Sequence, residues 1–124
     1  MKQKILLLLT GVTLLFQACE ETEYVKASPQ LEISVVNNST AFVEGATVAL
    51  YNSRDDWELK SNVLSTLQTN SEGKVLFKDL KEQKYYFFVE KNEMDNLADI
   101  AATWEPLKTG QKSEVVVKIM NSNL

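Results

Sequence analysis

The chain alternates apolar and polar residues over several short segments, which is the pattern of β-strands that bury one face. In the segment 31–36 (LEISVV) the apolar positions are Leu31, Ile33 and Val35. Alternation recurs in the segments 46–51, 75–80 and 113–120, and the aromatic and β-branched residues of 85–90 also favour a strand, although both of its faces are apolar at first. Two further candidate strands with weaker patterns lie at 63–69 and 100–107. The side chains predicted to point inward are Leu31, Ile33, Val35, Ala46, Val48, Leu50, Val75, Phe77, Tyr85, Phe87, Val89, Val115, Val117 and Ile119.

Polar segments with turn-forming residues separate the candidate strands. One of them is NSEGK at 70–74, where Gly73 is expected to adopt a positive φ. No long amphipathic helix intervenes, so parallel βαβ units are not expected. About seven short strands with frequent turns are typical of an antiparallel β-sandwich. The sequence therefore predicts an all-β fold, a small antiparallel sandwich of about seven strands and Greek-key type over residues 31–124, with Phe42 and Trp104 also in its core.

A polar stretch at 52–62 interrupts the alternation and is expected to hold a turn of helix. Ser53 followed by Asp56 matches a helix-capping pattern. Trp57 lies in this stretch beside Asp55 and Asp56. An exposed tryptophan next to acids can stack on a sugar or dock a protein. The alternative is that the ring folds back over one end of the sandwich, because large aromatic side chains are usually well buried.

The N-terminus has the features of an export signal. Two lysines precede the segment Ile5–Phe16, which is apolar except for two threonines and a glycine. This run is shorter than the roughly 20 residues that span a bilayer as a helix. It suits the hydrophobic region of a secretory signal peptide. Ala18 then precedes Cys19, the single cysteine of the chain.

This order of features resembles a bacterial lipoprotein signal peptide. The resemblance implies cleavage before Cys19, attachment of a diacylglycerol to its thiol and acylation of the new N-terminus. Phe16 and Gln17 depart from the usual pattern, which has leucine and a small residue at those places. The alternative is an ordinary secretory signal with a chance cysteine. An unpaired thiol is a liability in an oxidising compartment, and lipidation removes it.

Residues 19–30 lack apolar periodicity and are interpreted as the acylated cysteine followed by a flexible tether. Glu20, Glu21 and Glu23 follow the cysteine closely. They resemble the signal that exports some lipoproteins to the outer face of the outer membrane, and the alternative is a solvated linker. The expected location is the cell envelope of a Gram-negative bacterium, anchored by lipid in the outer membrane, with the face left open.

The segment 31–120 resembles the transthyretin-like β-sandwiches, which include carboxypeptidase regulatory-like domains and the B-type repeats of collagen adhesins. The matching elements are Gly45 and Ala46 leading into Val48 and Leu50, Thr69 with Gly73 four residues on, Phe77, Leu80 and Tyr85. The resemblance implies strands in two sheets and a role as a spacer, an adhesive module or an accessory part of a surface assembly.

Composition excludes several kinds of chemistry. The chain has no histidine, so it lacks the commonest general base and metal ligand. The transthyretin-like hydrolases need histidines and are rejected. The isopeptide bond of the adhesin repeats needs a lysine on the first strand, and 31–36 contains none. The net charge of −4 without a basic stripe argues against nucleic acid.

A second acidic cluster, Asp95, Asn96 and Asp99, lies in the stretch 91–99, where another helical turn is expected. Calcium needs six to eight oxygen ligands, and neither acidic cluster has the spacing of a calcium loop. The sequence therefore predicts no metal, no cofactor and no enzymatic activity.

The function predicted from the sequence is a lipid-anchored, non-enzymatic β-sandwich module of the cell envelope. It is expected to bind a protein partner through loops or a sheet edge, as an accessory part of a surface assembly. The alternative is an accessory lipoprotein that binds a glycan or a small ligand through Trp57, Asp55 and Asp56.

Overall fold

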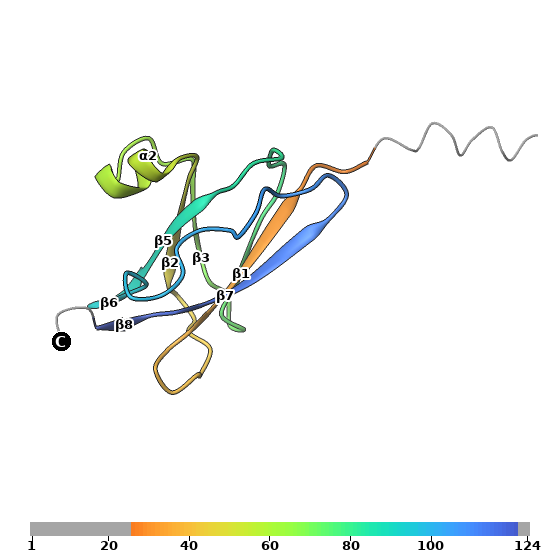
Figure 1. The fold of residues 1–124 in the computed structure, drawn as a ribbon. Coiled ribbons are helices and arrows are strands. Elements are labelled where there is room, and N and C mark those ends of the chain that lie inside the picture. The colour runs from red at the N-terminus through yellow and green to blue at the C-terminus, as the bar shows by residue number, and fades with distance from the viewer. Residues whose placement is uncertain (1–25, 122–124) are drawn as a thin grey trace, which may run out of the picture.

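The computed structural model describes residues 26–121, which fold into eight strands and one short helix (Figure 1). The helix is α2 (Arg54–Leu59). The strands are β1 (Gln30–Val36), β2 (Thr47–Tyr51), β3 (Ser65–Gln68), β4 (Lys74–Phe77), β5 (Tyr86–Lys91), β6 (Met94–Asp95), β7 (Lys112–Lys118) and β8 (Met120–Asn121).

The strands form two sheets that pack face to face. One has the order β4-β1-β7 and the other β3-β2-β5-β6-β8. Neighbouring strands are antiparallel except β1 and β7, which run parallel from Gln30↔Lys112 to Val36↔Lys118. The predicted β-sandwich is therefore confirmed. It differs in detail by this parallel pair and by the two short strands β6 and β8, which extend the second sheet.

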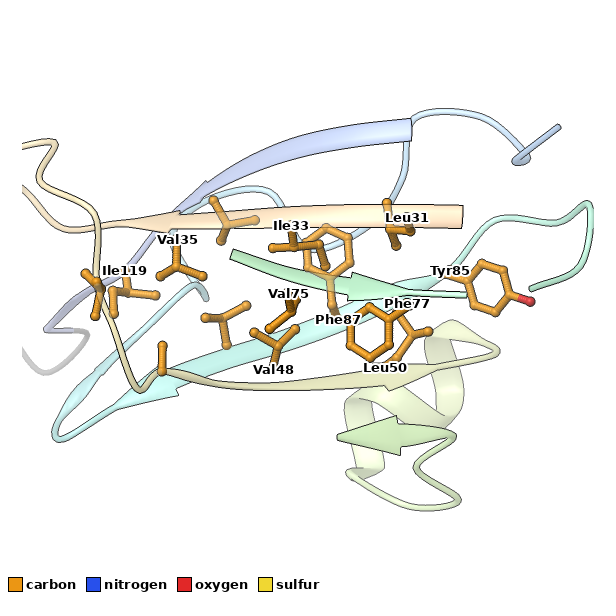
Figure 2. Packing of buried hydrophobic residues seen from close by; sticks show 14 of the residues in the cluster. Leu31, Ile33, Val35, Val48, Leu50, Val75, Phe77, Tyr85, Phe87 and Ile119 are labelled. Atoms are coloured by element: carbon orange, nitrogen blue, oxygen red, sulfur yellow. The ribbon is translucent and has the colours of Figure 1, made fainter. Parts of the chain in front are cut away.

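The core follows the alternation of the sequence. Leu31, Ile33 and Val35 of β1 are fully buried, and Figure 2 shows them pointing toward Val48 and Leu50 of β2. Burying a side chain of this size contributes about 1.5–3 kcal/mol to stability. The predicted inward positions of the other strands are buried in the same cluster, and only Val115 is half-buried at its margin.

The two sides of the sandwich are built differently. On one side the chain crosses between the sheets where β7 ends and β8 begins, and Ile119 N donates to Val36 O at 2.9 Å. On the other side lie the outer strands β3 and β4, and within the described residues β3 pairs only with β2 and β4 only with β1. The sandwich is thus closed by the chain along one side and open along the other.

Side chains complete the edge of β5 where no strand pairs with it. Asn96 is fully buried, and its amide oxygen accepts a hydrogen bond from Val89 N at 3.0 Å. Its amide nitrogen donates to Phe87 O at 3.2 Å. Nearer the start of β5, the hydroxyl of Thr103 accepts from Tyr85 N at 3.1 Å. These side chains satisfy backbone groups that would otherwise be buried without partners.

This edge explains two wrong predictions. The stretch 91–99 forms β6 and turns rather than a helical turn, and this turn directs its buried asparagine into the edge. The segment 100–107 is not a strand, because its only ladder contact is the bridge between Ala102 and Tyr86. It follows β5 as a loop. The hydroxyl of Thr103 holds it, together with two backbone hydrogen bonds, from Phe87 N to Ala101 O at 2.9 Å and from Thr103 N to Tyr85 O at 3.0 Å.

Two aromatic side chains predicted for the core lie at the surface. Phe42 is 60% exposed in the loop before β2, and Trp104 is 83% exposed in the loop before β7. Trp104 is directed outward because its neighbour Thr103 takes the inward position on β5. Phe42 packs over Gly73, whose φ of +76 confirms the predicted turn.

Candidate functional site

The helix α2 forms where the capping pattern predicts it. Ser53 has extended backbone angles, and its hydroxyl accepts a hydrogen bond from Asp56 N at 3.1 Å. This bond satisfies one of the free N–H groups at the start of the helix. The helix ends at Lys60, which adopts the left-handed conformation with φ of 54°. The two ends of α2 are therefore set by local capping residues, and the helix positions Trp57.

Trp57 is half-buried against the five-stranded sheet. Its indole N–H donates to Phe87 O at 3.0 Å, the same carbonyl that the buried asparagine contacts. The ammonium of Lys60 lies 4.9 Å from the centre of the Trp57 ring and 4.4 Å from that of Phe88, at cation–π distance. The indole therefore uses its N–H for Phe87 O and has Lys60 over its ring. This arrangement matches the alternative prediction, in which the Trp57 ring folds back onto the sandwich.

The acids beside Trp57 differ in role. Asp55 is exposed, whereas one carboxylate oxygen of Asp56 accepts from the amide of Asn62 at 3.0 Å. The hydroxyl of Ser61 approaches the same oxygen at 3.5 Å. Asp56 therefore ties the helix to the turn that follows it, and Asp55 remains at the surface. The structure places Trp57, Asp55 and Asp56 on one helix.

The second acidic cluster is also engaged in local structure. Asn96 bonds the edge of β5, and Asp99 accepts from Lys118 N at 2.7 Å. Asp95 accepts from Leu97 N at 3.0 Å. No group of three or more histidine, cysteine or acidic side chains is placed to hold a metal ion within residues 26–121.

A groove of about 440 Å³ opens on the side of the sandwich between β3 and β4. We call it the lateral groove. Its apolar walls are formed by Leu64, Leu67, Leu76, Phe77, Leu80 and Tyr85, and its polar lining includes Asn52, Lys78, Asp79 and Lys81. Leu64 and Leu67 of its lining are also exposed large apolar side chains. A cluster of exposed apolar side chains of this kind marks an interaction surface more often than single ones do.

The two strands beside the lateral groove have free outer edges. An edge strand offers unpaired N–H and C=O groups to which an extended segment of another chain can add as a new strand. Alternate side chains of such a segment would enter the groove, where Leu67 and Leu76 are partly exposed. The combination of bare edges and an apolar groove is the geometry that protein recognition by strand addition requires.

A second surface lies at the end of the sandwich where the described chain begins. We call this the tether end and define it as residues 26–29, the loop 78–84 and the loop 103–111, which adjoin in Figure 1. Gly110 N donates to Ala27 O at 2.7 Å, and Leu80 N donates to Pro29 O at 3.1 Å. These described residues of the predicted tether therefore lie against the domain.

Glu82 joins the two loops of the tether end. One of its carboxylate oxygens accepts from the backbone N of Thr109 at 3.0 Å and from its hydroxyl at 2.8 Å. These hydrogen bonds, with the charge of Lys26 as a lesser cause, lower the pKa of Glu82 below its ordinary value. The loops also meet where Leu107 N donates to Gln83 O at 3.1 Å.

Sequence reasoning missed the lateral groove and the exposure of Trp104. The groove depends on which strands end up at the sheet edges, and no local pattern reports that. A signal for Trp104 was present, because Pro106 follows two residues later and disfavours a central strand. Cys19 lies outside the described residues, so its role as the lipid attachment site stays a prediction. Among the residues described, no helix is long and apolar enough to cross a membrane.

No family model matches the chain, and no curated protein matches it in sequence. Among solved structures, the backbone protein of the group B streptococcus pilus 2b superposes with a TM-score of 0.52 at 18% identity, over 74% of this chain and 40% of that one. The Bacillus anthracis TIE protein gives 0.49 at 17% identity, over 73% and 17% of the chains. Catechol 1,2-dioxygenase from Pseudomonas arvilla C-1 gives 0.45 at 9% identity, over 76% and 53%.

The chain thus spans two fifths of the pilus protein's length, at 40%. At this level of identity the likeness concerns the fold alone. It agrees with the β-sandwich described above.

Proposed function

We propose that this protein is a lipid-anchored, non-enzymatic module of the cell envelope that binds a protein partner through its lateral groove. The observation that carries the proposal is the apolar groove between two bare strand edges. The partner would contribute an extended segment with apolar side chains at alternate positions. Such a segment would pair with one edge and insert side chains beside Leu67 and Leu76.

The proposed location rests on the order of features at the N-terminus. A cationic start, an apolar run and Ala18 precede Cys19, as in a lipoprotein signal. A double or triple acyl anchor holds a protein stably on a membrane. We place the protein on the outer membrane of a Gram-negative cell, where it would be an accessory part of a surface assembly.

The glycan-binding alternative has less support. A sugar-stacking tryptophan presents an open ring face, but Lys60 lies over the Trp57 ring. The indole N–H is already bonded to Phe87 O. Asp56 is bonded to the turn after α2, so one of the two acids predicted to contact a ligand is also engaged.

A photo-crosslinking residue at position 76 tests the partner in intact cells. A single adduct is expected, and Leu67→Lys should reduce it at least about tenfold, because a buried charge without a partner opposes docking. Thr66→Lys is the matched control, since Thr66 is exposed on the opposite face of the same strand. Equal adducts in the two variants would exclude the groove as the binding surface.

Cys19→Ser tests the anchor separately. The variant should lose incorporation of labelled fatty acid and leave the membrane fraction. A variant that stays with the membrane after a high-salt wash would show that Cys19 is not the tether.

A further inference from the structure

We propose that the tether end is a membrane-docking surface that binds the headgroups of anionic lipids, with Trp104 placed at the interface. The inference deepens the proposed function and rests on its lipid anchor, because it says which face of the anchored domain meets the membrane. Three observations support it: the charge of this end, the exposure of Trp104 and the position of the chain entry.

The tether end is basic within an acidic protein. Five lysines lie on it, against the three carboxylates of Asp79, Glu82 and Glu105, and all five are exposed: Lys26, Lys78, Lys81, Lys84 and Lys108. The opposite end carries six carboxylates from Glu44, Glu72, Glu90, Glu93, Asp95 and Asp99 against the three lysines Lys74, Lys91 and Lys118. The charge of the domain is therefore polarised along its length, with the positive end where the chain enters.

The positive charge of this end is available to a partner. Within the described part of the chain, the ammonium groups of Lys78, Lys81, Lys84 and Lys108 form no ion pair. The carboxylate of Glu82 is exposed as well, but it is engaged by two hydrogen bonds from Thr109. Clustered lysines of this kind attract anionic lipid surfaces over about a Debye length, roughly 8 Å at physiological ionic strength.

Trp104 lies on the same end as these lysines. It is 83% exposed and shares the wall of one hollow with Lys84. It also borders a second hollow with Gln111, which hydrogen-bonds the first residue of β1 through its carbonyl. Tryptophan favours the boundary between lipid headgroups and hydrocarbon, because its ring is apolar and its N–H is polar. An exposed indole among lysines is therefore suited to an anionic membrane surface.

The chain entry keeps this end within reach of the membrane. The first described residue, Lys26, lies beside Gly110 on the tether end. The seven residue-to-residue steps from Cys19 to Lys26 span at most about 25 Å when fully extended. β1 carries the opposite end roughly 20 Å farther away. An acyl group at Cys19 thus holds the basic end near the headgroups and keeps the acidic end away from them.

Vesicle binding by a non-acylated protein tests the surface apart from the anchor. The protein is the chain from residue 19 with Cys19→Ser, which retains every residue of the core cluster, from Leu31 to Ile119. A cooperative thermal transition verifies that it is folded. We expect it to sediment with vesicles that contain phosphatidylglycerol and to bind vesicles of phosphatidylcholine at least about tenfold less. It should be released by 0.5 M NaCl, which shortens the Debye length to roughly half of its physiological value.

Paired lysine variants locate the surface. Lys81→Gln with Lys84→Gln should weaken binding to the anionic vesicles about fivefold per lysine. Lys74→Gln with Lys118→Gln changes the net charge equally on other parts of the domain and should leave binding within about twofold. Equal loss in the two pairs would overturn the proposal, because net charge rather than the tether end would then control binding.

Tryptophan fluorescence tests the placement of Trp104 in the acylated full chain. In the Trp57→Phe variant, bilayers with brominated anionic lipids should quench the remaining Trp104 emission at least about twofold and shift it to shorter wavelength. In the Trp104→Phe variant, the emission of Trp57 should remain unchanged. A Trp104 that is not quenched would show that this end faces water or a protein partner. The two proposals can fail separately. If Cys19→Ser releases the protein from the membrane but Trp104 is not quenched in the acylated chain, the lipid anchor stands and only the docking surface is refuted.

Discussion

The two tryptophans occupy regions that border the same strand and yet behave in opposite ways. Trp57, on α2, reaches Phe87 O with its N–H and is half-buried. Trp104 lies in the loop 100–107, which follows the edge of β5, and is 83% exposed. In the first region the aromatic side chain makes the attachment. In the second, the side chains of Asn96 and Thr103 make it together with two backbone hydrogen bonds, which leaves the tryptophan free to contact something else.

Whether each tryptophan is exposed depends on which side chain forms the hydrogen bonds to the backbone of β5. The carbonyl of Phe87 accepts from both Trp57 and Asn96, so the two regions share one acceptor. A polar side chain that bonds buried backbone groups must stay in place, because losing the bond leaves them unsatisfied. Trp104, in the loop that these side chains hold, therefore does not need to be buried.

The largest effect is expected from Asn96→Ala, which removes the side chain that holds the loop. Val89 N and Ile100 O lose their bonds to a fully buried amide. We expect the free energy of unfolding to fall by about 3 kcal/mol. Chemical denaturation measures it, with the exposed Asn38→Ala as the control. A loss below about 1 kcal/mol would mean that the loop is held by other contacts.

The next effect directly compares the two aromatic residues. Trp57→Ala should cost about 2 kcal/mol of unfolding free energy, because it removes a half-buried ring and its hydrogen bond to Phe87 O. Trp104→Ala should change stability by less than about 0.5 kcal/mol, since its side chain is largely exposed. Thermal unfolding of the two variants side by side gives the difference. Similar losses would remove the structural distinction between the regions.

A smaller effect is expected at the start of α2, which positions Trp57. Ser53→Ala removes the hydroxyl that accepts from Asp56 N. The loss should be about 1 kcal/mol, as for other N-cap residues. Ser71→Ala, in an exposed turn, is the control for the substitution itself. If the two variants unfold at the same denaturant concentration, the cap does not hold the helix.

The smallest effect is expected from Glu82, which bonds Thr109 in the loop 103–111 after Trp104. The pKa of Glu82 is lowered by its hydrogen bonds to Thr109 and, to a lesser degree, by Lys26. A carboxylate with a lowered pKa stabilises the fold above its unfolded pKa, and this contribution disappears as the pH falls through the folded pKa. The Glu82→Gln variant should therefore be less stable than the wild type at neutral pH. The difference in free energy of unfolding between the two proteins should shrink as the pH is lowered through the acidic range.

Denaturation at neutral and acidic pH measures that narrowing. Glu105→Gln, which alters another exposed carboxylate of the tether end, serves as the control. A wild-type advantage that persists unchanged below the folded pKa would show that the Glu82 charge does not contribute to joining the loops.

Much of the sandwich could be predicted from the alternation of apolar residues. The inward sets of β1, β2 and β5 are buried as expected, because a period of two fixes which side chains share a face. The cap at Ser53 and the positive φ of Gly73 also follow from local residue types. These features depend on neighbours in sequence, and the sequence displays them directly.

The rest depends on contacts between distant segments. Asn96 resembles any polar loop residue until β5 is present to receive it, and Phe42 and Trp104 resemble core residues until other side chains fill their places. The lateral groove exists because β3 and β4 are both outermost strands. Nothing local in the sequence reports the order of strands in a sheet.

The parallel pairing of β1 with β7 would have a mechanical consequence under the proposed N-terminal anchor. A pull on residue 26 acts along β1, which lies between β4 and β7 and is bonded to strands on both of its sides. The force then shears two ladders at once, so that many hydrogen bonds resist together instead of opening one after another. Tension between the proposed anchor and a moving partner would thus be opposed by both ladders of β1 together.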